Sequence, residues 1–137
     1  MIVGIAALVL LSGGIGVATF MTTGVLTASQ ILQFAANAEF AGNDLIKAVA
    51  VALAESGGNP MAHGDTTLGS GTGSFGLWQI YSDAHPEYGP DFTILYDPQT
   101  NANAAYAIYA EAGNSFMPWS TYKSGRYLAY LSQAQNA

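Results

Sequence analysis

The stretch Ala48-Val-Ala-Val-Ala-Leu-Ala-Glu-Ser-Gly-Gly-Asn-Pro60 predicts the end of a buried helix that carries a single carboxylate, Glu55. The run before Glu55 is apolar and uncharged, and two glycines, an asparagine and a proline follow it closely. The unpaired carbonyl groups of a helix C-terminal turn carry partial negative charge, so an ionised glutamate is disfavoured there. We therefore expect the pKa of Glu55 to be raised, which suits an acid that donates a proton near neutral pH.

The residues around this stretch predict a mainly α-helical fold. Asn43 is a suitable N-cap for the helix that reaches Glu55. Asp97-Pro98 resembles another helix start, with proline at the first helical position, and residues 127–135 predict a last helix. No segment alternates apolar and polar residues convincingly, which also favours a mainly helical fold.

Composition limits the chain to one domain and excludes several functions. At 137 residues there is room for a single hydrophobic core. Three Lys and Arg residues against nine Asp and Glu residues give a net charge of −6, which argues against nucleic acid as a partner, because phosphates require a surplus of cations. There is no cysteine, and His63 and Asp65 have no second histidine at ligand spacing, so neither a metal nor a cofactor is expected.

The N-terminal segment Ile2–Met21 is uncharged and differs from the rest of the chain. In a helix its roughly twenty residues would just cross a hydrocarbon core about 30 Å thick. We expect residues 1–26 to form a hydrophobic, transmembrane-type helix that anchors a globular domain at residues 27–137. Two alternatives remain open. One is a signal peptide, for which the usual basic residues are missing, and the other is a hydrophobic arm that packs inside a larger assembly.

A second motif, Gly76-Leu-Trp-Gln-Ile80, follows a glycine-rich loop at residues 61–74. Glycines allow the main chain to approach a ligand closely. Gln79 is expected to be a ligand contact or a loop tether, because a buried glutamine needs hydrogen-bond partners. Trp78 is equally consistent with core packing and with stacking on a sugar. All eight tyrosines follow this motif, and aromatic faces with neutral hydrogen-bond donors suit a neutral sugar polymer.

Three motifs in this order resemble the catalytic domain of the soluble lytic transglycosylases, a lysozyme-like superfamily that cleaves peptidoglycan. The similarity covers roughly residues 28–131 and rests on Glu55-Ser-Gly-Gly-Asn-Pro60, Gly73-Ser-Phe-Gly-Leu-Trp-Gln-Ile80 and Asn103-Ala-Ala-Tyr106. The resemblance implies a lysozyme-like helical domain at residues 27–137, in which Glu55 is the catalytic acid.

The resemblance also implies a set of substrate-binding residues. Ser56 would contact the substrate or position the acid, and Gln79 would line the cleft. The loop at residues 118–125 resembles that of one variant of the family, so Tyr122 could supply a phenol near the acid, although the more usual Ala-Tyr-Asn-Ala-Gly segment is absent. Trp78 and Tyr106 complete the expected set.

The reaction implied by the resemblance needs one carboxylate. Glu55 would protonate the glycosidic oxygen between N-acetylmuramic acid and N-acetylglucosamine, and would then accept the proton of the C6 hydroxyl as a 1,6-anhydro ring closes. A hydrolytic lysozyme would normally need a second carboxylate, about 5–5.5 Å away for retention or about 6.5–9.5 Å away for inversion. Asp65, Asp83 and Asp91 are the candidates for that role.

Two further alternatives are not enzymes: a structural subunit with a disused lysozyme-like domain, and a membrane-perturbing protein whose globular half only binds glycan. The expected partner of the catalytic domain is a peptidoglycan glycan strand. Residues 2–21 would contact a membrane or other proteins of a virion or envelope complex. The chain is thus expected at the bacterial envelope, facing the peptidoglycan, or in a phage virion.

Overall fold

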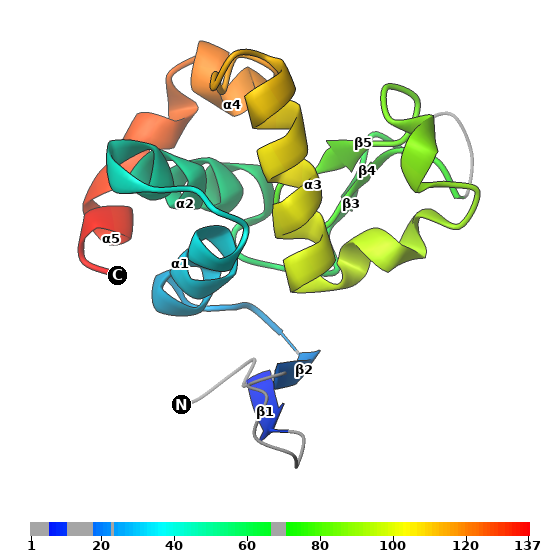
Figure 1. Ribbon diagram of the computed structural model, residues 1–137, viewed down its shortest axis with the longest axis horizontal. Helices are drawn as coiled ribbons and strands as arrows, with labels where there is room; N and C mark the ends of the chain where they lie inside the picture. The colour runs from blue at the N-terminus through cyan, green and yellow to red at the C-terminus, as the bar shows by residue number, and fades with distance from the viewer. Residues whose placement is uncertain (1–5, 11–17, 23, 67–70) are drawn as a thin grey trace.

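The computed structural model describes residues 6–10, 18–22, 24–66 and 71–137, and its central element is the helix that carries Glu55 (Figure 1). This helix, α2, spans Gly42–Ser56, and every residue from Ala48 to Ala54 is buried. Most of these side chains are small, so neighbouring segments can approach the helix closely. Helix α1 (Ala28–Asn37) packs against both α2 and α3 (Pro98–Glu111). The prediction of a mainly helical domain is confirmed.

The two ends of α2 are formed differently. At the C-terminus Gly57 adopts a left-handed conformation (φ +62°), and its N–H donates to the Leu53 carbonyl at 2.8 Å. Glycine favours this conformation because it has no Cβ. At the N-terminus Ala41 is the cap and no side chain contributes a hydrogen bond. The prediction that Asn43 caps the helix is therefore wrong, since the helix has already begun at Gly42.

The second half of the domain begins with two short 3₁₀ helices, η2 (Pro86–Tyr88) and η3 (Phe92–Tyr96). Helix α3 then starts as predicted, because the Asp97 carboxylate accepts a hydrogen bond from the backbone N–H of Thr100 at 2.9 Å. The C-terminal region consists of α4 (Ser120–Lys123), η4 (Arg126–Tyr130) and α5 (Leu131–Gln135). The single last helix expected at residues 127–135 is thus divided, with a 3₁₀ turn before the α-helical one.

A small antiparallel sheet, in the order β3-β4-β5, lies beside the helices. Its strands are β3 (His63–Gly64), β4 (Ser74–Phe75) and β5 (Ile80–Tyr81). His63 pairs with Phe75, and Ser74 pairs with Tyr81. These strands were not predicted, because strands of two residues are too short to show an alternating pattern in the sequence.

Asn101, a fully buried residue of α3, fixes the turn between β4 and β5. Its side-chain oxygen accepts a hydrogen bond from the Trp78 N–H at 2.8 Å. Its amide nitrogen donates to the carbonyls of Phe75 at 2.8 Å and Leu95 at 2.9 Å. A Cβ at Gly76 would overlap both this amide and the Leu95 carbonyl, so only glycine fits at that position. The sheet is therefore held against α3 by one buried polar side chain.

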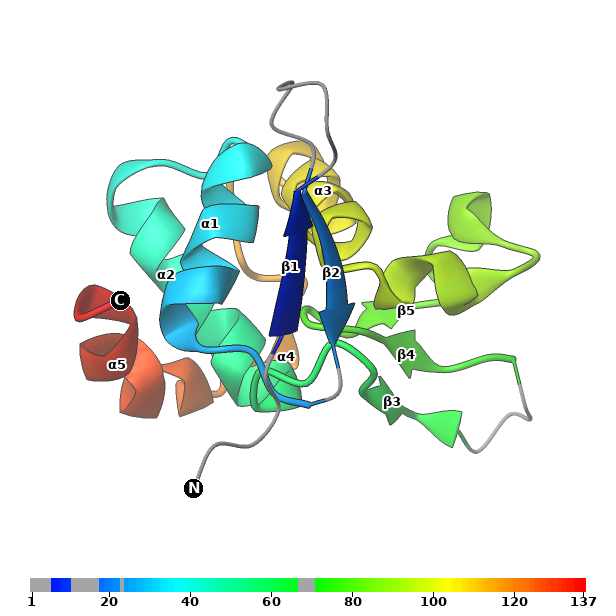
Figure 2. The same ribbon diagram turned by 90° about the horizontal axis from the view of Figure 1, so that it is seen from below.

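The N-terminal segment contains a hairpin in which β1 (Ala6–Leu10) pairs with β2 (Ala18–Thr22) in antiparallel register (Figures 1 and 2). At these residues the prediction of a transmembrane-type helix is wrong, and the other residues of Ile2–Met21 lie outside the described part of the chain. The sequence offers a reason: glycines at positions 13, 14 and 16 interrupt the apolar run and disfavour a helix. No helix among the described residues has the length and hydrophobicity that crossing a membrane requires.

Candidate active site

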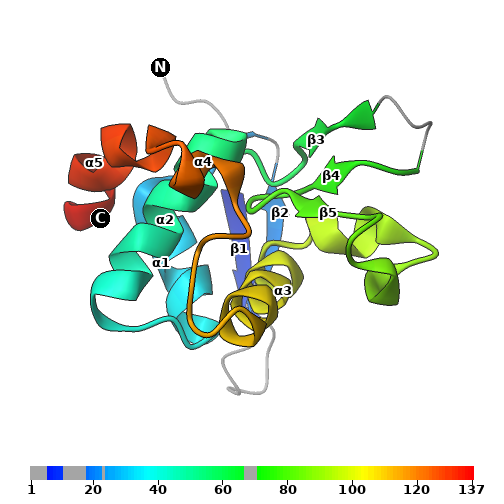
Figure 3. The same cartoon turned by 90° about the horizontal axis from the view of Figure 1, so that it is seen from above.

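Glu55 lies in the last turn of α2, beside the short helix α4 (Figure 3). Its side chain is partly buried, and its Oε2 atom accepts a hydrogen bond from the Thr121 hydroxyl at 2.8 Å. Thr121 is only 3% exposed, so packing holds the donor in place. No cation of the described residues forms an ion pair with Glu55. The carboxyl group is therefore oriented by a neutral donor and is not neutralised by a salt bridge.

Burial raises the pKa of Glu55 above its ordinary value of 4.5. The nearby Asp65 carboxylate also raises this pKa, whereas the hydrogen bonds from Thr121 and the charge of Arg126 lower it. The predicted direction is confirmed, and its largest cause is the loss of hydration on burial. Glu55 consequently keeps its proton to a higher pH than an exposed glutamate, as a general acid requires.

Glu55 borders a cleft of about 410 Å³ that has two walls. The helical wall consists of Glu55, from α2, and of the segment that leads into and through α4. The sheet wall consists of residues in and next to β3, β4 and β5. Figure 3 shows α4 and this sheet near the same end of α2. The lining residues are Glu55, Pro118, Trp119, Ser120 and Lys123 on the helical wall, and Asp65, Ser74, Gln79 and Tyr81 on the sheet wall.

Two further cavities lie next to the cleft. A second cavity of about 220 Å³ shares Gln79, Tyr81, Pro118 and Trp119 with the cleft. A third, of about 260 Å³, shares three lining residues with the second, including Pro118. Because neighbouring cavities share lining residues, the three lie next to one another, and such a row suits several units of a polymer better than an isolated pocket would.

Asp65 is the candidate second carboxylate that lies in the cleft. It accepts a hydrogen bond from the Ser74 hydroxyl at 2.6 Å, and its charge is close enough to raise the pKa of Glu55. Asp91 instead caps η3 through Thr93, whose hydrogen bonds lower the pKa of Asp91. Asp83 accepts hydrogen bonds from the hydroxyl groups of Tyr81 and Ser82, and it does not itself line the cleft.

Gln79 both lines the cleft and tethers the loop, so the two expectations for this residue are combined. Its Nε2 atom donates to the carbonyls of Ala62 at 3.1 Å and Gly76 at 3.0 Å. Its backbone is left-handed (φ +49°), as is that of Asp65 (φ +51°). Left-handed residues other than glycine are uncommon and tend to occur at functional sites. Two of the four described residues of this kind lie on the sheet wall, and the other two, Glu39 and Asn114, lie outside the cleft.

Trp78 and Ser56 lie outside the cleft lining. Trp78 is fully buried and its indole N–H donates to the Ala48 carbonyl at 3.0 Å, so it is a core residue and the prediction of a substrate contact is wrong. The Ser56 hydroxyl donates to the Ala52 carbonyl at 2.9 Å and accepts from the Gly58 N–H at 3.2 Å. Ser56 therefore supports the helix end that carries the acid.

Tyr106 and Tyr122 also have packing partners away from the lining residues. Tyr106 packs edge-on against Phe40, with ring centres 5.1 Å apart. Tyr122 stacks on Tyr127, with ring centres 4.7 Å apart, and also contacts Phe116. The structure therefore places neither phenol among the residues that line the cleft. The neighbour of Tyr122 in sequence, Thr121, makes the contact with the acid.

Several residues of the site were not singled out from the sequence. Thr121, Trp119 and Lys123 all belong to the loop that carried the family resemblance, and this was the available signal. The Trp119 indole N–H donates to the Trp78 carbonyl at 2.8 Å, which joins the helical wall to the second motif. For Tyr81, on the sheet wall, the sequence contained no indication of a role in the site other than its aromatic side chain.

A metal centre has no structural support in the described part of the chain, where no three potential ligands gather. The His63 ring lies 2.6 Å from the Thr72 carbonyl oxygen and stacks on Phe75. His85 faces Glu87 at 3.4 Å. Both histidines therefore have local partners.

Comparison with known proteins agrees with this geometry. A family model described as a lysozyme-like domain matches residues 32–121, which is more than half of the chain and includes Glu55, all three motifs and Thr121. No curated protein and no solved structure matches the chain. The match confirms the resemblance seen in the motifs, and the chain belongs to the lysozyme-like domain family.

Proposed function

We propose that this protein is a peptidoglycan lytic transglycosylase that uses Glu55 as its only acid and base. The observation that carries the proposal is the partly buried Glu55 carboxyl, which has a raised pKa, lies on a cleft and is oriented by Thr121. Family membership supports the coarser function, a glycosidase that acts on peptidoglycan. The row of cavities next to the cleft suits a glycan strand.

In the proposed reaction Glu55 donates its proton to the glycosidic oxygen between N-acetylmuramic acid and N-acetylglucosamine. The bond from this oxygen to C1 of the muramic acid breaks, and the N-acetylglucosamine leaves with a free 4-hydroxyl group. The C6 hydroxyl of the muramic acid then bonds to C1, and its proton returns to the Glu55 carboxylate. The acid is restored, no water is consumed, and the product ends in a 1,6-anhydro sugar.

Hydrolysis is a second candidate, and Asp65 is the observation that favours it. A retaining or inverting lysozyme needs a second carboxylate across the scissile bond. Asp65 borders the same cleft as Glu55 and is held there by Ser74. Mass spectrometry of the released muropeptides separates the two reactions, because an anhydro product is lighter than a hydrolysis product by one water.

The activity is tested by clearing of purified sacculi with the wild type and with Glu55→Gln. The amide keeps the shape of the side chain but has no acidic proton, so we expect activity to fall by roughly a thousandfold. Glu39→Gln is the matched control, since Glu39 is exposed and does not line the cleft. Full activity of a folded Glu55→Gln variant would refute the proposal, as would an inactive wild type.

The proposed substrate also restricts where the protein can act. The domain must reach peptidoglycan, so we propose that it faces the wall in the bacterial envelope or is carried by a phage particle. Residues 1–26 would then attach it to a membrane or to other proteins. Deleting residues 1–22 keeps the buried Leu26 and its backbone hydrogen bond to Gly58, so it should leave clearing of sacculi in solution unchanged and should release the protein from its cellular fraction. A retained location after deletion would contradict this role.

A further inference from the structure

We propose that Lys123 binds a carboxylate on the C3 substituent of the muramic acid, so that the cleft prefers glycan strands whose substituents are anionic. This inference rests on the proposed function, because it assumes that the muramic acid ring lies beside Glu55. It assigns a specificity role to a residue outside the matched family region, which ends at residue 121.

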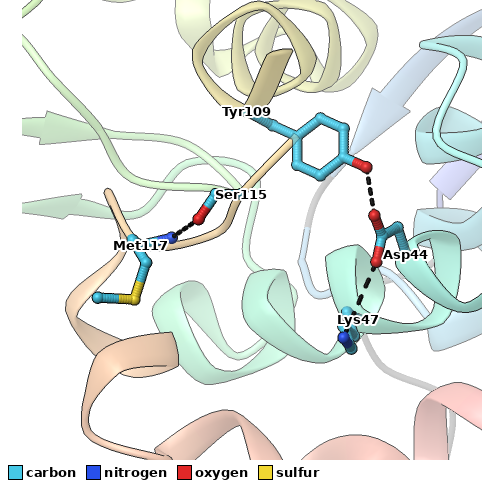
Figure 4. A network of polar contacts seen from close by, with 5 residues as sticks. All are labelled: Asp44, Lys47, Tyr109, Ser115 and Met117. Carbon is cyan, nitrogen blue, oxygen red and sulfur yellow. Dashed lines mark hydrogen bonds and ion pairs between the residues drawn. The ribbon is translucent and has the colours of Figure 1, made fainter. Parts of the chain in front are cut away.

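The first observation is the distribution of the few cations. The chain has three Lys and Arg residues. Lys47 forms an ion pair with Asp44 at 3.9 Å, and Asp44 also accepts a hydrogen bond from the Tyr109 hydroxyl (Figure 4). Lys123 lines the cleft and has no carboxylate within ion-pair distance among the described residues. The cleft therefore contains a cation that the protein itself does not neutralise.

The second observation concerns which positive charge acts on Glu55. The positive charge that lowers the pKa of Glu55 is that of Arg126, the first residue of η4. Lys123 is not among the causes of the Glu55 shift. Lys123, in α4, borders the cleft itself and can contact a ligand there.

The third step is the chemistry of the substrate. The muramic acid carries a lactyl ether at C3, which ends in a carboxylate or continues into a peptide that bears carboxylates. The protein has a net charge of −6, and Glu55 and Asp65 both lie in the cleft, so an anionic strand is repelled unless a local cation offsets these charges. A lysine ammonium is a compact charge with three donors on a flexible stem, which suits a carboxylate of variable position.

The geometry connects these observations. The sugar ring whose C1 is attacked must lie against Glu55, and its C3 substituent must leave the same cleft. Lys123 ends α4 on the helical wall, one helical turn or less from Trp119, Ser120 and Thr121. Lys123 thus borders the cleft into which the substituent of the reacting ring extends, which makes this substituent the group that we expect it to bind.

Co-sedimentation with insoluble sacculi tests the contact without relying on cleavage. The sacculi are first freed of other wall polymers, and one half is treated with carbodiimide and ammonia, which converts carboxylates into neutral amides. Apparent dissociation constants are measured in a Glu55→Gln background, alone and combined with Lys123→Gln. Lys47→Gln in the same background is the control for the loss of one positive charge elsewhere.

We expect Lys123→Gln to weaken binding to native sacculi about three- to five-fold, the size of an exposed ion pair, and to have little effect on amidated sacculi. Lys47→Gln should behave like its parent on both. Equal weakening by Lys123→Gln on both materials, or none on native sacculi, would overturn the inference. So would the absence of any binding to sacculi by the parent protein.

A further arm identifies which carboxylate is bound. An amidase that removes the peptide leaves the lactyl carboxylate on the strand. If the apparent dissociation constants of the parent and of Lys123→Gln still differ on this material, the lactyl carboxylate is the ligand. If they no longer differ, the ligand is a carboxylate of the peptide. The two proposals can fail separately. If the wild type does not clear sacculi but its binding still depends on Lys123, the proposed reaction is refuted and the contact between Lys123 and a carboxylate is retained.

Discussion

The two walls of the cleft differ in how they hold their functional groups. The helical wall places Glu55 at the end of a fifteen-residue helix with a fully buried middle, and Thr121 orients the acid by one hydrogen bond. The sheet wall consists of two-residue strands, and its residues Asp65 and Gln79 have left-handed backbones. One wall derives its precision from a long regular element, and the other from side-chain tethers such as Asn101.

The two walls also supply different functional groups. The helical wall supplies the acid, its neutral donor and a cation, all on α2 and in or next to α4. The sheet wall supplies a second carboxylate and the Gln79 side chain. A regular helix fixes a carboxyl group with few additional contacts, whereas a short irregular sheet must be tied down by buried hydrogen bonds. Variants that separate these two strategies test the comparison.

The largest effect is expected from Asn101→Ala, which removes the tether of the sheet wall. The change leaves the Trp78 N–H and the carbonyls of Phe75 and Leu95 without their partner, so unfolding free energy should fall by about 3 kcal/mol or more. Chemical denaturation measures it. The control is Asn103→Ala on the same helix, an exposed residue that should change stability by less than about 1 kcal/mol. Similar values for both variants would show that the sheet needs no such tether.

Thr121→Val is expected to have the next largest effect, and it tests the helical wall. Valine keeps the shape of the side chain but lacks the hydroxyl group. In the wild type the hydrogen bond from this hydroxyl lowers the pKa of Glu55. The alkaline limb of the pH–activity profile should therefore move to higher pH, and activity at the optimum should fall roughly tenfold because the acid is less well oriented. Thr121→Ser should retain the wild-type profile. An unchanged limb in the valine variant would mean that this hydroxyl does not tune the acid.

Asp65→Asn compares the two carboxylates directly. If Glu55 acts alone, as proposed, the loss of the Asp65 charge should reduce activity by less than about tenfold. The pKa of Glu55 should also decrease, because the Asp65 charge raises it. Initial rates on sacculi across a pH series measure both effects. A loss of activity comparable to that of Glu55→Gln, together with a hydrolysed product from the wild type, would favour the lysozyme reaction instead.

The smallest effect concerns stability and again involves Glu55. Because burial raises its pKa in the folded state, the folded protein binds more protons than the unfolded chain between pH 4.5 and the raised pKa. The contribution of the Glu55 carboxyl group to the free energy of unfolding is thus fully present below pH 4.5. It is lost as the pH rises from 4.5 through the raised pKa. Glu55→Gln should raise the melting temperature slightly at pH 7 and hardly at pH 4. A larger gain at pH 4 than at pH 7 would contradict this.

The helical wall was more predictable than the sheet wall. The sequence around Glu55 contains an apolar run and a glycine stop, which are local signals, so the helix end and the direction of the pKa shift could both be predicted. Asn101 had no local signal, because its three partners lie 6, 23 and 26 residues away in sequence. Trp78 and Tyr122 were assigned to the substrate for the same reason: burial and stacking partners depend on the packing of distant segments.

The sequence by itself determined the helical class, the position of the acid at the end of α2, and the lysozyme-like identity, because these depend on short-range patterns of residues. Only the tertiary structure decided that burial is the main cause of the raised Glu55 pKa, that Thr121 orients the carboxyl group, and that Asp65 and Lys123 share its cleft. The physical reason is that hydration, hydrogen bonding and charge proximity are properties of the space around a group, and segments far apart in the sequence create that space.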